Sequence, residues 1–375
     1  MERIWVNQRG YVVDLPMASP NFRYWQCPLH PSMWKYLAFQ FKGQLYCFTH
    51  LPFGVAPACY VYTTIKQEIF RPLRAAGLRM VFLIDDQCSL EKGQARTQML
   101  AAALCRLLAS LGYTLSIEKC QLSPEQLLKF LGLLVDLEAR AFRVPQQKLE
   151  QLVELARECQ LASALSDRLV AKVAGKVMAL APAMHLAPLV ARDMWRASQG
   201  SGWDELYPAP TAFSAAVELL VELLARSNGK KWERRLEVVR VVGDASDRGL
   251  AAYTPNGELS GHVSVPFTWE QQQAVRLNKW SSTARELQVV GEVVQTFADT
   301  RPGFLLGKRL LYGTDNQATM HDLMRMKGSQ DTYPIVRETV LLCQSVDVEL
   351  EVEWRPRTHS EQQVSVESKD RCWIY

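Results

Sequence analysis

The chain lacks any long hydrophobic segment. None of its apolar runs approaches the roughly 20 residues needed to cross a membrane, and Met1–Arg9 lacks the apolar centre of a signal peptide. These absences predict a soluble, intracellular protein without a membrane partner. The net charge is only +4, so contact with nucleic acid would depend on local clusters of basic residues. At 375 residues, we expect two or three domains.

Paired metal-binding and disulfide motifs are also missing. The nine cysteines are scattered singly without a Cys-x-x-Cys pair, and the six histidines show no metal-ligand spacing. This pattern predicts reduced thiols and argues against a disulfide scaffold or a zinc site. No strand is followed by a glycine-rich phosphate loop, which argues against a nucleotide-dependent α/β metabolic enzyme.

The most informative feature present is an acidic pair, Asp85 and Asp86. It follows the apolar run 80–84 and precedes the polar residues 87–89. Adjacent carboxylates repel each other unless they are solvated or surround divalent cations, and Mg²⁺ prefers such oxygen ligands. The pair therefore predicts a metal-binding hairpin, although a solvated turn closing an ordinary hairpin has the same local pattern.

The residues upstream support the first interpretation. Leu51–Ala58 reads Leu-Pro-Phe-Gly-Val-Ala-Pro-Ala and follows the hairpin-like segment 36–46. The order of hairpin, Leu-Pro-Phe-Gly turn, helix and acidic pair resembles the palm of retroelement reverse transcriptases. Residues 111–113, 119–120 and 130–136 are similar to segments that follow the acidic pair in that family.

The resemblance implies roles for particular residues. Asp85 would hold Mg²⁺, with Mn²⁺ as an alternative, and Asp86 would support the metal site. Phe53 and Gly54 would shape the floor of the nucleotide pocket, and Lys119 would lie near the triphosphate. Leu83 and Ile84 stand where the family usually has Tyr or Phe and one further residue.

A third palm carboxylate is expected five residues before Tyr24, where this chain has Ser19. Asp14 has the right local surroundings but lies five residues too early, so its role as a metal ligand stays open. Few residues precede Asp14, so compared with that family we expect the fingers subdomain to be largely missing. Because positioning supplies much of the rate in phosphoryl transfer, we expect a truncated or decayed enzyme.

A second set of carboxylates lies towards the other end of the chain. Asp244 and Asp315 each end an apolar strand pattern, and Glu286 lies between them in a helical pattern. Strand-Asp, helix-Glu and strand-Asp-Asn in this order resemble ribonuclease H. The resemblance implies that these three residues hold two Mg²⁺ ions for attack on an RNA phosphodiester. Taken singly, each is equally typical of a solvated strand end or helix surface.

Ribonuclease H usually has a fourth carboxylate, eight residues after a proline that corresponds to Pro356. That position is Val364, and the neighbouring Glu361, Glu367 and Asp370 are out of register. Loss of one ligand in four would weaken the second metal without dismantling the fold.

The fold expected is α+β and multidomain. A reverse-transcriptase palm with an antiparallel sheet and helices occupies 1–145, a helical thumb or connection 146–228, and an α/β ribonuclease H-like domain 237–375. Apolar residues at helical spacing after residue 145 predict the helices of the middle region. Five basic residues in 226–235 are typical of either a duplex contact or a solvated linker.

The function expected is an RNA-directed DNA polymerase with ribonuclease H from a retrotransposon polyprotein. The motifs are most similar to tyrosine-recombinase (DIRS-like) retrotransposons. Its partners would be an RNA template, a DNA primer, the RNA/DNA hybrid and deoxynucleoside triphosphates. The alternative is a retroelement remnant that binds nucleic acid without catalysis. The sequence gives no indication of the oligomeric state.

Overall fold

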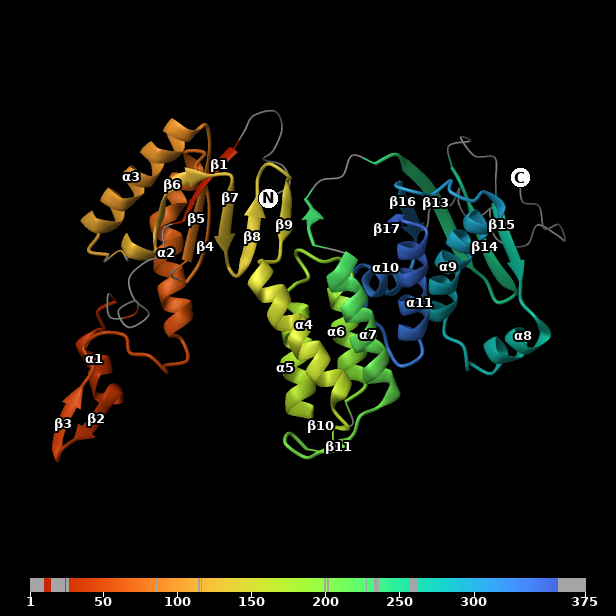
Figure 1. The fold of residues 1–375 in the computed structure, drawn as a ribbon, viewed down its shortest axis with the longest axis horizontal. Coiled ribbons are helices and arrows are strands. Elements are labelled where there is room, and N and C mark those ends of the chain that lie inside the picture. The colour runs from red at the N-terminus through yellow and green to blue at the C-terminus, as the bar shows by residue number, and fades with distance from the viewer. Residues whose placement is uncertain are drawn as a thin grey trace. The chain divides into compact units, whose positions relative to one another are not determined.

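The computed structural model describes residues 10–14, 24, 27–84, 86–113, 115, 117–198, 200, 202–226, 228–232, 236–255 and 262–356. The chain divides into two compact units (Figure 1). The N-terminal unit comprises Met1–Glu158, Leu180–His185 and Val221–Glu233. The C-terminal unit comprises Cys159–Ala179, Leu186–Leu220 and Arg234–Tyr375. The middle helical region is thus divided between the two units.

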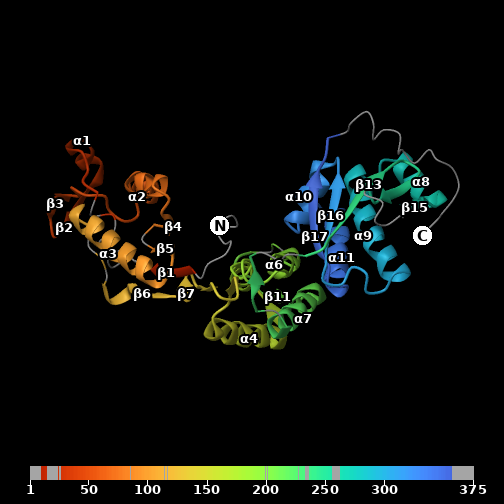
Figure 2. The ribbon, with the colours of Figure 1, turned by 90° about the horizontal axis from the view of Figure 1, so that it is seen from above.

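The main sheet of the N-terminal unit is antiparallel, with strand order β4-β5-β1-β6. These strands are β1 (Gly10–Asp14), β4 (Arg79–Leu83), β5 (Asp86–Lys92) and β6 (Gln121–Glu125). Helices α2 (Ala58–Ala75) and α3 (Gln94–Ser110) pack on this sheet (Figures 1 and 2). Their apolar faces form the core together with the sheet, and this core includes Tyr62, Phe70, Met80, Leu100, Leu104 and Leu108.

Smaller elements complete this unit. Helix α1 (Pro31–Trp34) and the 3-10 helix η3 (Lys35–Leu37) precede the exposed hairpin of β2 (Ala38–Phe41) and β3 (Gln44–Cys47). A second antiparallel sheet has the order β12-β9-β8-β7. Its strands are β7 (Leu127–Phe130), β8 (Leu133–Asp136), β9 (Ala141–Arg143) and β12 (Lys230–Lys231). Helix α4 (Gln146–Leu161) follows β9.

The basic segment near residue 230 is therefore partly a strand. Lys230 and Lys231 pair with Phe142 and Ala141 of β9. The ring of Trp232 packs on Phe142 with centroids 5.3 Å apart. Backbone pairing and aromatic packing hold this part of the segment against the sheet, in contrast to a free linker.

The C-terminal unit contains a five-stranded mixed sheet with order β15-β14-β13-β16-β17. Strands β13 (Val238–Ala245), β14 (Gly249–Tyr253) and β15 (His262–Pro266) are antiparallel. Strands β16 (Arg309–Thr314) and β17 (Glu349–Trp354) continue the sheet in parallel from β13. Because β13 and β16 are parallel, their carboxyl ends lie at the same edge of the sheet.

Helices surround this sheet. Helix α9 (Ser282–Thr300) packs on β13 and β14, and α11 (Tyr333–Ser345) packs on α9. Helix α10 (Gln317–Met324) contacts β17, and the short α8 (Trp269–Arg276) precedes α9. Leu287, Val290 and Val294 of α9 are fully buried, as their helical spacing predicts.

Further helices belong to the same unit. They are α5 (Asp167–Met178), α6 (Ala187–Arg196) and the first part of α7 (Thr211–Arg226). The strands β10 (Ala164–Leu165) and β11 (Tyr207–Pro208) form a small ladder beside them. Asp193 of α6 accepts hydrogen bonds from Tyr333 Oη at 2.7 Å and Arg337 Nε at 2.8 Å. Helices α6 and α11 are thereby joined through the carboxylate of this half-buried residue.

Within the described part of the chain, no helix combines the length and apolar character that a membrane crossing requires.

Candidate metal-binding sites

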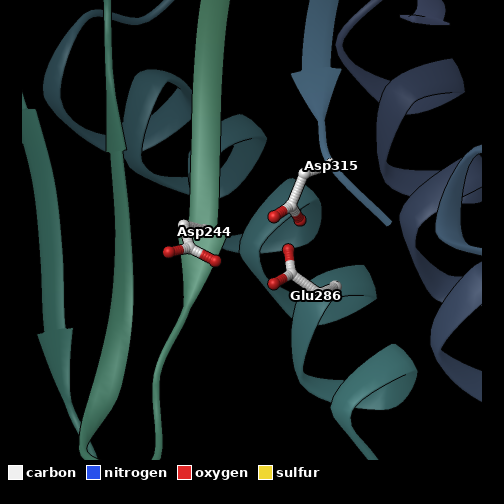
Figure 3. Close-up of side chains that lie close together, drawn as sticks. All are labelled: Asp244, Glu286 and Asp315. Carbon is white, nitrogen blue, oxygen red and sulfur yellow. The ribbon is translucent and has the colours of Figure 1, made fainter. Parts of the chain in front are cut away.

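Three carboxylates meet at one edge of the five-stranded sheet. Asp244 lies near the end of β13, Asp315 directly follows β16, and Glu286 lies on α9. One oxygen from each lies within 4.8 Å of the others, and Figure 3 shows the side chains pointing towards one another. These are the residues that the sequence indicated, and the structure brings them together.

Local structure explains this convergence. Because β13 and β16 are parallel, with Val242 opposite Gly313, their carboxyl ends deliver Asp244 and Asp315 to the same edge. Helix α9 begins after Ser281, whose hydroxyl accepts a hydrogen bond from the Ala284 amide at 3.2 Å. Glu286 therefore lies in the second turn of α9, beside the two strand ends.

The electrostatics favour a cation at this cluster. Glu286 is only 2% exposed, and burial raises its pKa to about 8. The amide of Ala245 donates to Glu286 Oε1 at 3.0 Å and lowers the pKa, whereas Asp244 and Asp315 raise it further. Among the described residues, Glu286 Oε2 has no hydrogen-bond donor.

The donor set fits a hard divalent cation. Carboxylate oxygens are the usual ligands of Mg²⁺ and Mn²⁺. A cation bound to Asp244, Glu286 and Asp315 would offset their mutual repulsion and supply a partner for the buried carboxylate of Glu286. The assignment of these residues as metal ligands stays a prediction.

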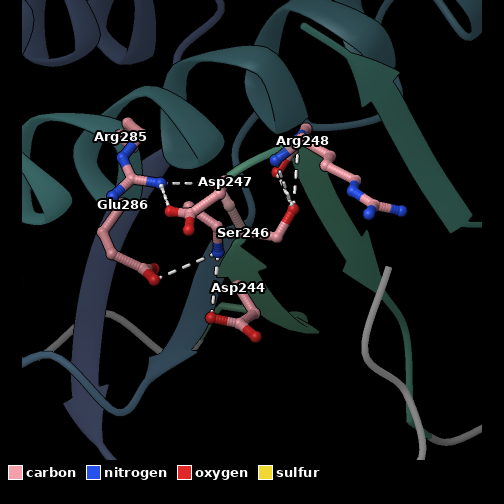
Figure 4. A network of polar contacts seen from close by, with 8 residues as sticks. Asp244, Ser246, Asp247, Arg248, Arg285 and Glu286 are labelled. Atoms are coloured by element: carbon pink, nitrogen blue, oxygen red, sulfur yellow. Dashed lines mark hydrogen bonds and ion pairs between the residues drawn. The ribbon is translucent and has the colours of Figure 1, made fainter. Parts of the chain in front are cut away.

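The turn after Asp244 is held by Arg285, which the sequence analysis did not single out. Its Nη1 donates to the carbonyl of Ser246 at 2.6 Å and to Asp247 Oδ1 at 2.7 Å. Arg285 is 9% exposed, and Figure 4 shows it beside Glu286 on α9. A basic residue directly before Glu286 was the only sequence signal for this contact.

The palm carboxylates are described in part. Asp86 is the first residue of β5, is half-buried and pairs with Leu83, whereas Asp85 lies outside the described residues. Asp14 ends β1, with its backbone opposite Cys88 of β5 and Gln121 of β6. Despite the five extra residues before Tyr24, the register thus places Asp14 on the strand next to the acidic hairpin.

A buried lysine also reaches this hairpin. Lys66 of α2 is fully buried, and its Nζ donates to the carbonyl of Ile84 at 2.7 Å. Ile84 has φ of 49°, which is strained for a β-branched residue. Sequence analysis missed Lys66, although its spacing from Tyr62 and Phe70 places it on the buried face of α2.

The remaining predicted palm residues lie on loops and short elements. Phe53 is 46% exposed, and its ring centroid is 4.9 Å from that of Tyr24. Gly54 adopts φ of 85° in the turn before α2, a conformation that favours glycine. Lys119 is exposed at the end of the 3-10 helix η4 (Ile117–Lys119). Their roles in nucleotide binding stay predictions.

Several positions from the sequence analysis fall outside the described residues. They are Ser19 in the first palm segment, and Val364, Glu361, Glu367 and Asp370 near the C-terminus.

A comparison with known families identifies the region that contains the acidic hairpin. Residues 18–135 match the family model "Reverse transcriptase (RNA-dependent DNA polymerase)". The match begins after Asp14, so it contains Asp85 and Asp86 but not the proposed third ligand. No curated protein matches the chain.

Three solved structures of foamy viral protease-reverse transcriptase have a similar fold. The first, in complex with RNA/DNA hybrid, is 13% identical with a TM-score of 0.54; the similarity covers 99% of this chain and 47% of that one. The second, a form called dRH in complex with double-stranded DNA, is 13% identical with a TM-score of 0.53, over 94% of this chain and 58% of that one. The third, also with double-stranded DNA, is 12% identical with a TM-score of 0.52, over 94% and 69%.

The chain thus spans about half the length of the first of these proteins. At this identity the likeness concerns the fold, which is mixed α+β and similar to that of a reverse transcriptase.

Proposed function

We propose that the chain is an RNA-directed DNA polymerase with a C-terminal ribonuclease H, encoded by a retrotransposon of the tyrosine-recombinase type. The observation that carries the proposal is the combination of two features in one chain. A region that matches reverse transcriptases contains the acidic hairpin, and a separate cluster gathers Asp244, Glu286 and Asp315. The parts would be a palm (1–145), a helical thumb or connection (146–228) and a nuclease domain (237–375).

In the polymerase, Asp85 and Asp14 would hold divalent cations, and Asp86 would support their site. Bound Mg²⁺, or Mn²⁺, would align the primer 3′-hydroxyl with the α-phosphate and neutralise developing charge. Phe53 and Gly54 would shape the floor of the nucleotide pocket. Lys119, which is exposed, would offer its ammonium group to the triphosphate.

In the nuclease, Asp244, Glu286 and Asp315 would hold cations against the scissile phosphate of the RNA strand in an RNA/DNA hybrid. Arg285 would keep the turn after Asp244 in place through its bonds to Ser246 and Asp247. The buried position of Glu286 would exclude water from one side of the site. The substrates of the whole protein would be an RNA template, a DNA primer and deoxynucleoside triphosphates.

Two assays on one set of variants test the proposal. Wild-type protein should extend a DNA primer on an RNA template and cleave the RNA of a hybrid, both with Mg²⁺ or Mn²⁺. Asp85→Ala should abolish extension and leave cleavage, whereas Asp315→Asn should abolish cleavage and leave extension. Loss of one metal ligand should lower the rate by about 10³-fold or more.

The alternative is a remnant that binds nucleic acid without catalysis. The presence of Ser19 where the family spacing expects a carboxylate favours this alternative for the polymerase half. A remnant would retain hybrid in a gel-shift assay but show neither extension nor cleavage at any protein concentration. Activity that disappears in Asp85→Ala or Asp315→Asn would exclude it.

A further inference from the structure

Tyr312 carries a buried hydroxyl beside the carboxylate cluster. It lies on β16, three residues before Asp315, and its side chain is fully buried. Among the described residues, the hydroxyl has no hydrogen-bond partner. A buried hydroxyl without a partner destabilises the fold, and an apolar side chain at this strand position would avoid that cost.

The hydroxyl of Tyr312 lies next to the backbone of Gly243. A Cβ atom added to Gly243 would lie 2.1 Å from Tyr312 Oη and 2.7 Å from Val289 Cγ1. Gly243 directly precedes Asp244, and Val289 lies about one helical turn after Glu286. The hydroxyl thus lies at the base of the cluster, in space that a side chain at position 243 would fill.

The electrostatic environment agrees with this position. Burial raises the pKa of Tyr312 well above its ordinary value, and the charges of Glu286, Asp244 and Asp315 raise it further. The hydroxyl therefore remains protonated and available as a donor. Glu286 Oε2 is a buried acceptor that also lacks a partner among the described residues.

We propose that Tyr312 is a positioning residue of the carboxylate site, and that its hydroxyl donates a hydrogen bond to Glu286 Oε2 when a divalent cation is bound. A buried donor and a buried acceptor, neither of which has a hydrogen-bond partner among the described residues, are thereby satisfied together. Gly243 provides the space for the hydroxyl. This inference rests on the proposed metal site of the nuclease and adds a residue to it.

The test compares Tyr312→Phe with Tyr253→Phe, which removes a hydroxyl from β14 of the same sheet. Both changes are made in the full chain carrying Asp14→Asn, Asp85→Asn and Asp86→Asn, so that Mn²⁺ binding reports the C-terminal cluster. Calorimetric titration with Mn²⁺ should show about ten- to hundredfold weaker binding for Tyr312→Phe, the change expected when one hydrogen bond to a charged group is lost. Tyr253→Phe should bind Mn²⁺ like its parent.

Thermal unfolding without metal separates positioning from packing. Because the Tyr312 hydroxyl has no hydrogen-bond partner among the residues that the structure describes, the melting temperature of Tyr312→Phe should equal or exceed that of its parent. Unchanged Mn²⁺ affinity in Tyr312→Phe would overturn the inference, as would weaker binding accompanied by a lower metal-free melting temperature.

Failure of the nuclease proposal has a different outcome. A parent that binds Mn²⁺ while the wild-type chain cleaves no hybrid refutes the nuclease activity alone, and the affinity of Tyr312→Phe still decides the role of the hydroxyl. A parent that binds no Mn²⁺ overturns both the metal site and the inference.

Discussion

The two acidic sites are assembled in different ways. The palm pair is adjacent in the sequence, and its second member, Asp86, begins β5 opposite Leu83 of β4. The C-terminal cluster draws one carboxylate from each of two strands and one from a helix, between residues 244 and 315. The first site depends mainly on local geometry, whereas the second depends on the packing of a whole unit.

The sites also differ in the groups that approach them. The ammonium of Lys66 binds the carbonyl of Ile84, the residue before Asp85. Glu286 instead receives a backbone hydrogen bond from Ala245, and the neighbouring Arg285 is bonded to the turn after Asp244. A cation should therefore matter more for the stability of the C-terminal cluster. The following experiments test this contrast.

The largest expected effect is a pH dependence of stability due to Glu286. Its pKa is about 8 when folded, against an ordinary value of 4.5. Below the ordinary value the group is protonated in both states, so its contribution to stability is fully present. Between these two pKa values the folded state keeps the proton and the unfolded state releases it. As pH rises towards 8, the free energy of unfolding of the metal-free protein should therefore fall by up to a few kcal/mol.

Urea unfolding in the presence of a chelator, at about pH 5 and about pH 8, measures this effect. Glu286→Gln should flatten the pH dependence, and Mg²⁺ should restore wild-type stability at the higher pH. If the free energy of unfolding of Glu286→Gln depended on pH as strongly as that of the wild type, this interpretation of the cluster would be contradicted.

The second effect concerns the support of the C-terminal cluster by distant packing. Asp193→Asn should weaken the contacts with Tyr333 and Arg337, because the carboxylate accepts both hydrogen bonds and its side chain is only 9% exposed. We expect a loss of about 2–3 kcal/mol in the free energy of unfolding. Tyr333→Phe removes only one of these bonds and should cost about half as much. Similar values for the two variants would show that Arg337 adds little.

The third effect concerns the hairpin. Lys66→Met removes the donor to the Ile84 carbonyl and should lower the free energy of unfolding by about 1–2 kcal/mol. Primer extension should fall by about tenfold, as is typical when a group that orients metal ligands is lost, while hybrid cleavage stays unchanged. Lys66→Arg keeps a donor and should retain more extension activity than Lys66→Met. If both variants extend like wild type, the lysine has no part in positioning the pair.

The smallest effect concerns the start of α9. Ser281→Ala removes the hydroxyl that caps this helix and should lower the free energy of unfolding by about 1 kcal/mol. Because Glu286 lies in the second turn of the same helix, this variant should also weaken Mn²⁺ binding. Ser281→Asp keeps an acceptor and should retain most of the stability. Thr268→Ala, at the cap of α8, is a control that should lower stability similarly without weakening Mn²⁺ binding. Equal effects of the two alanine variants on Mn²⁺ binding would argue against a link between the cap and Glu286.

Much of the local structure was accessible from the sequence. The apolar spacing of Leu287, Val290 and Val294 predicted the buried face of α9, because burial on a helix follows its 3.6-residue period. The apolar segments before Asp86, Asp244 and Asp315 predicted strands, and the structure has β4, β13 and β16 there.

Other contacts had no adequate sequence signal. The sequence did not single out Arg285 or Lys66, but both are buried, and each binds a backbone carbonyl far away in the chain. Asp14 lies five residues before the position that the family spacing predicts, yet strand pairing places it beside β5. Spacing counted along a chain fails when an insertion separates residues that a sheet aligns.

The sequence alone was sufficient to predict the helices and strands named above and the chemistry of each acidic group. The reason is that helical period, strand alternation and carboxylate repulsion act over short stretches of chain. Folding in three dimensions was needed to bring Asp244, Glu286 and Asp315 within reach of one another and to bury the side chain of Tyr312. The physical reason is that burial and the resulting pKa shifts come from neighbours distant in sequence, which no local pattern specifies.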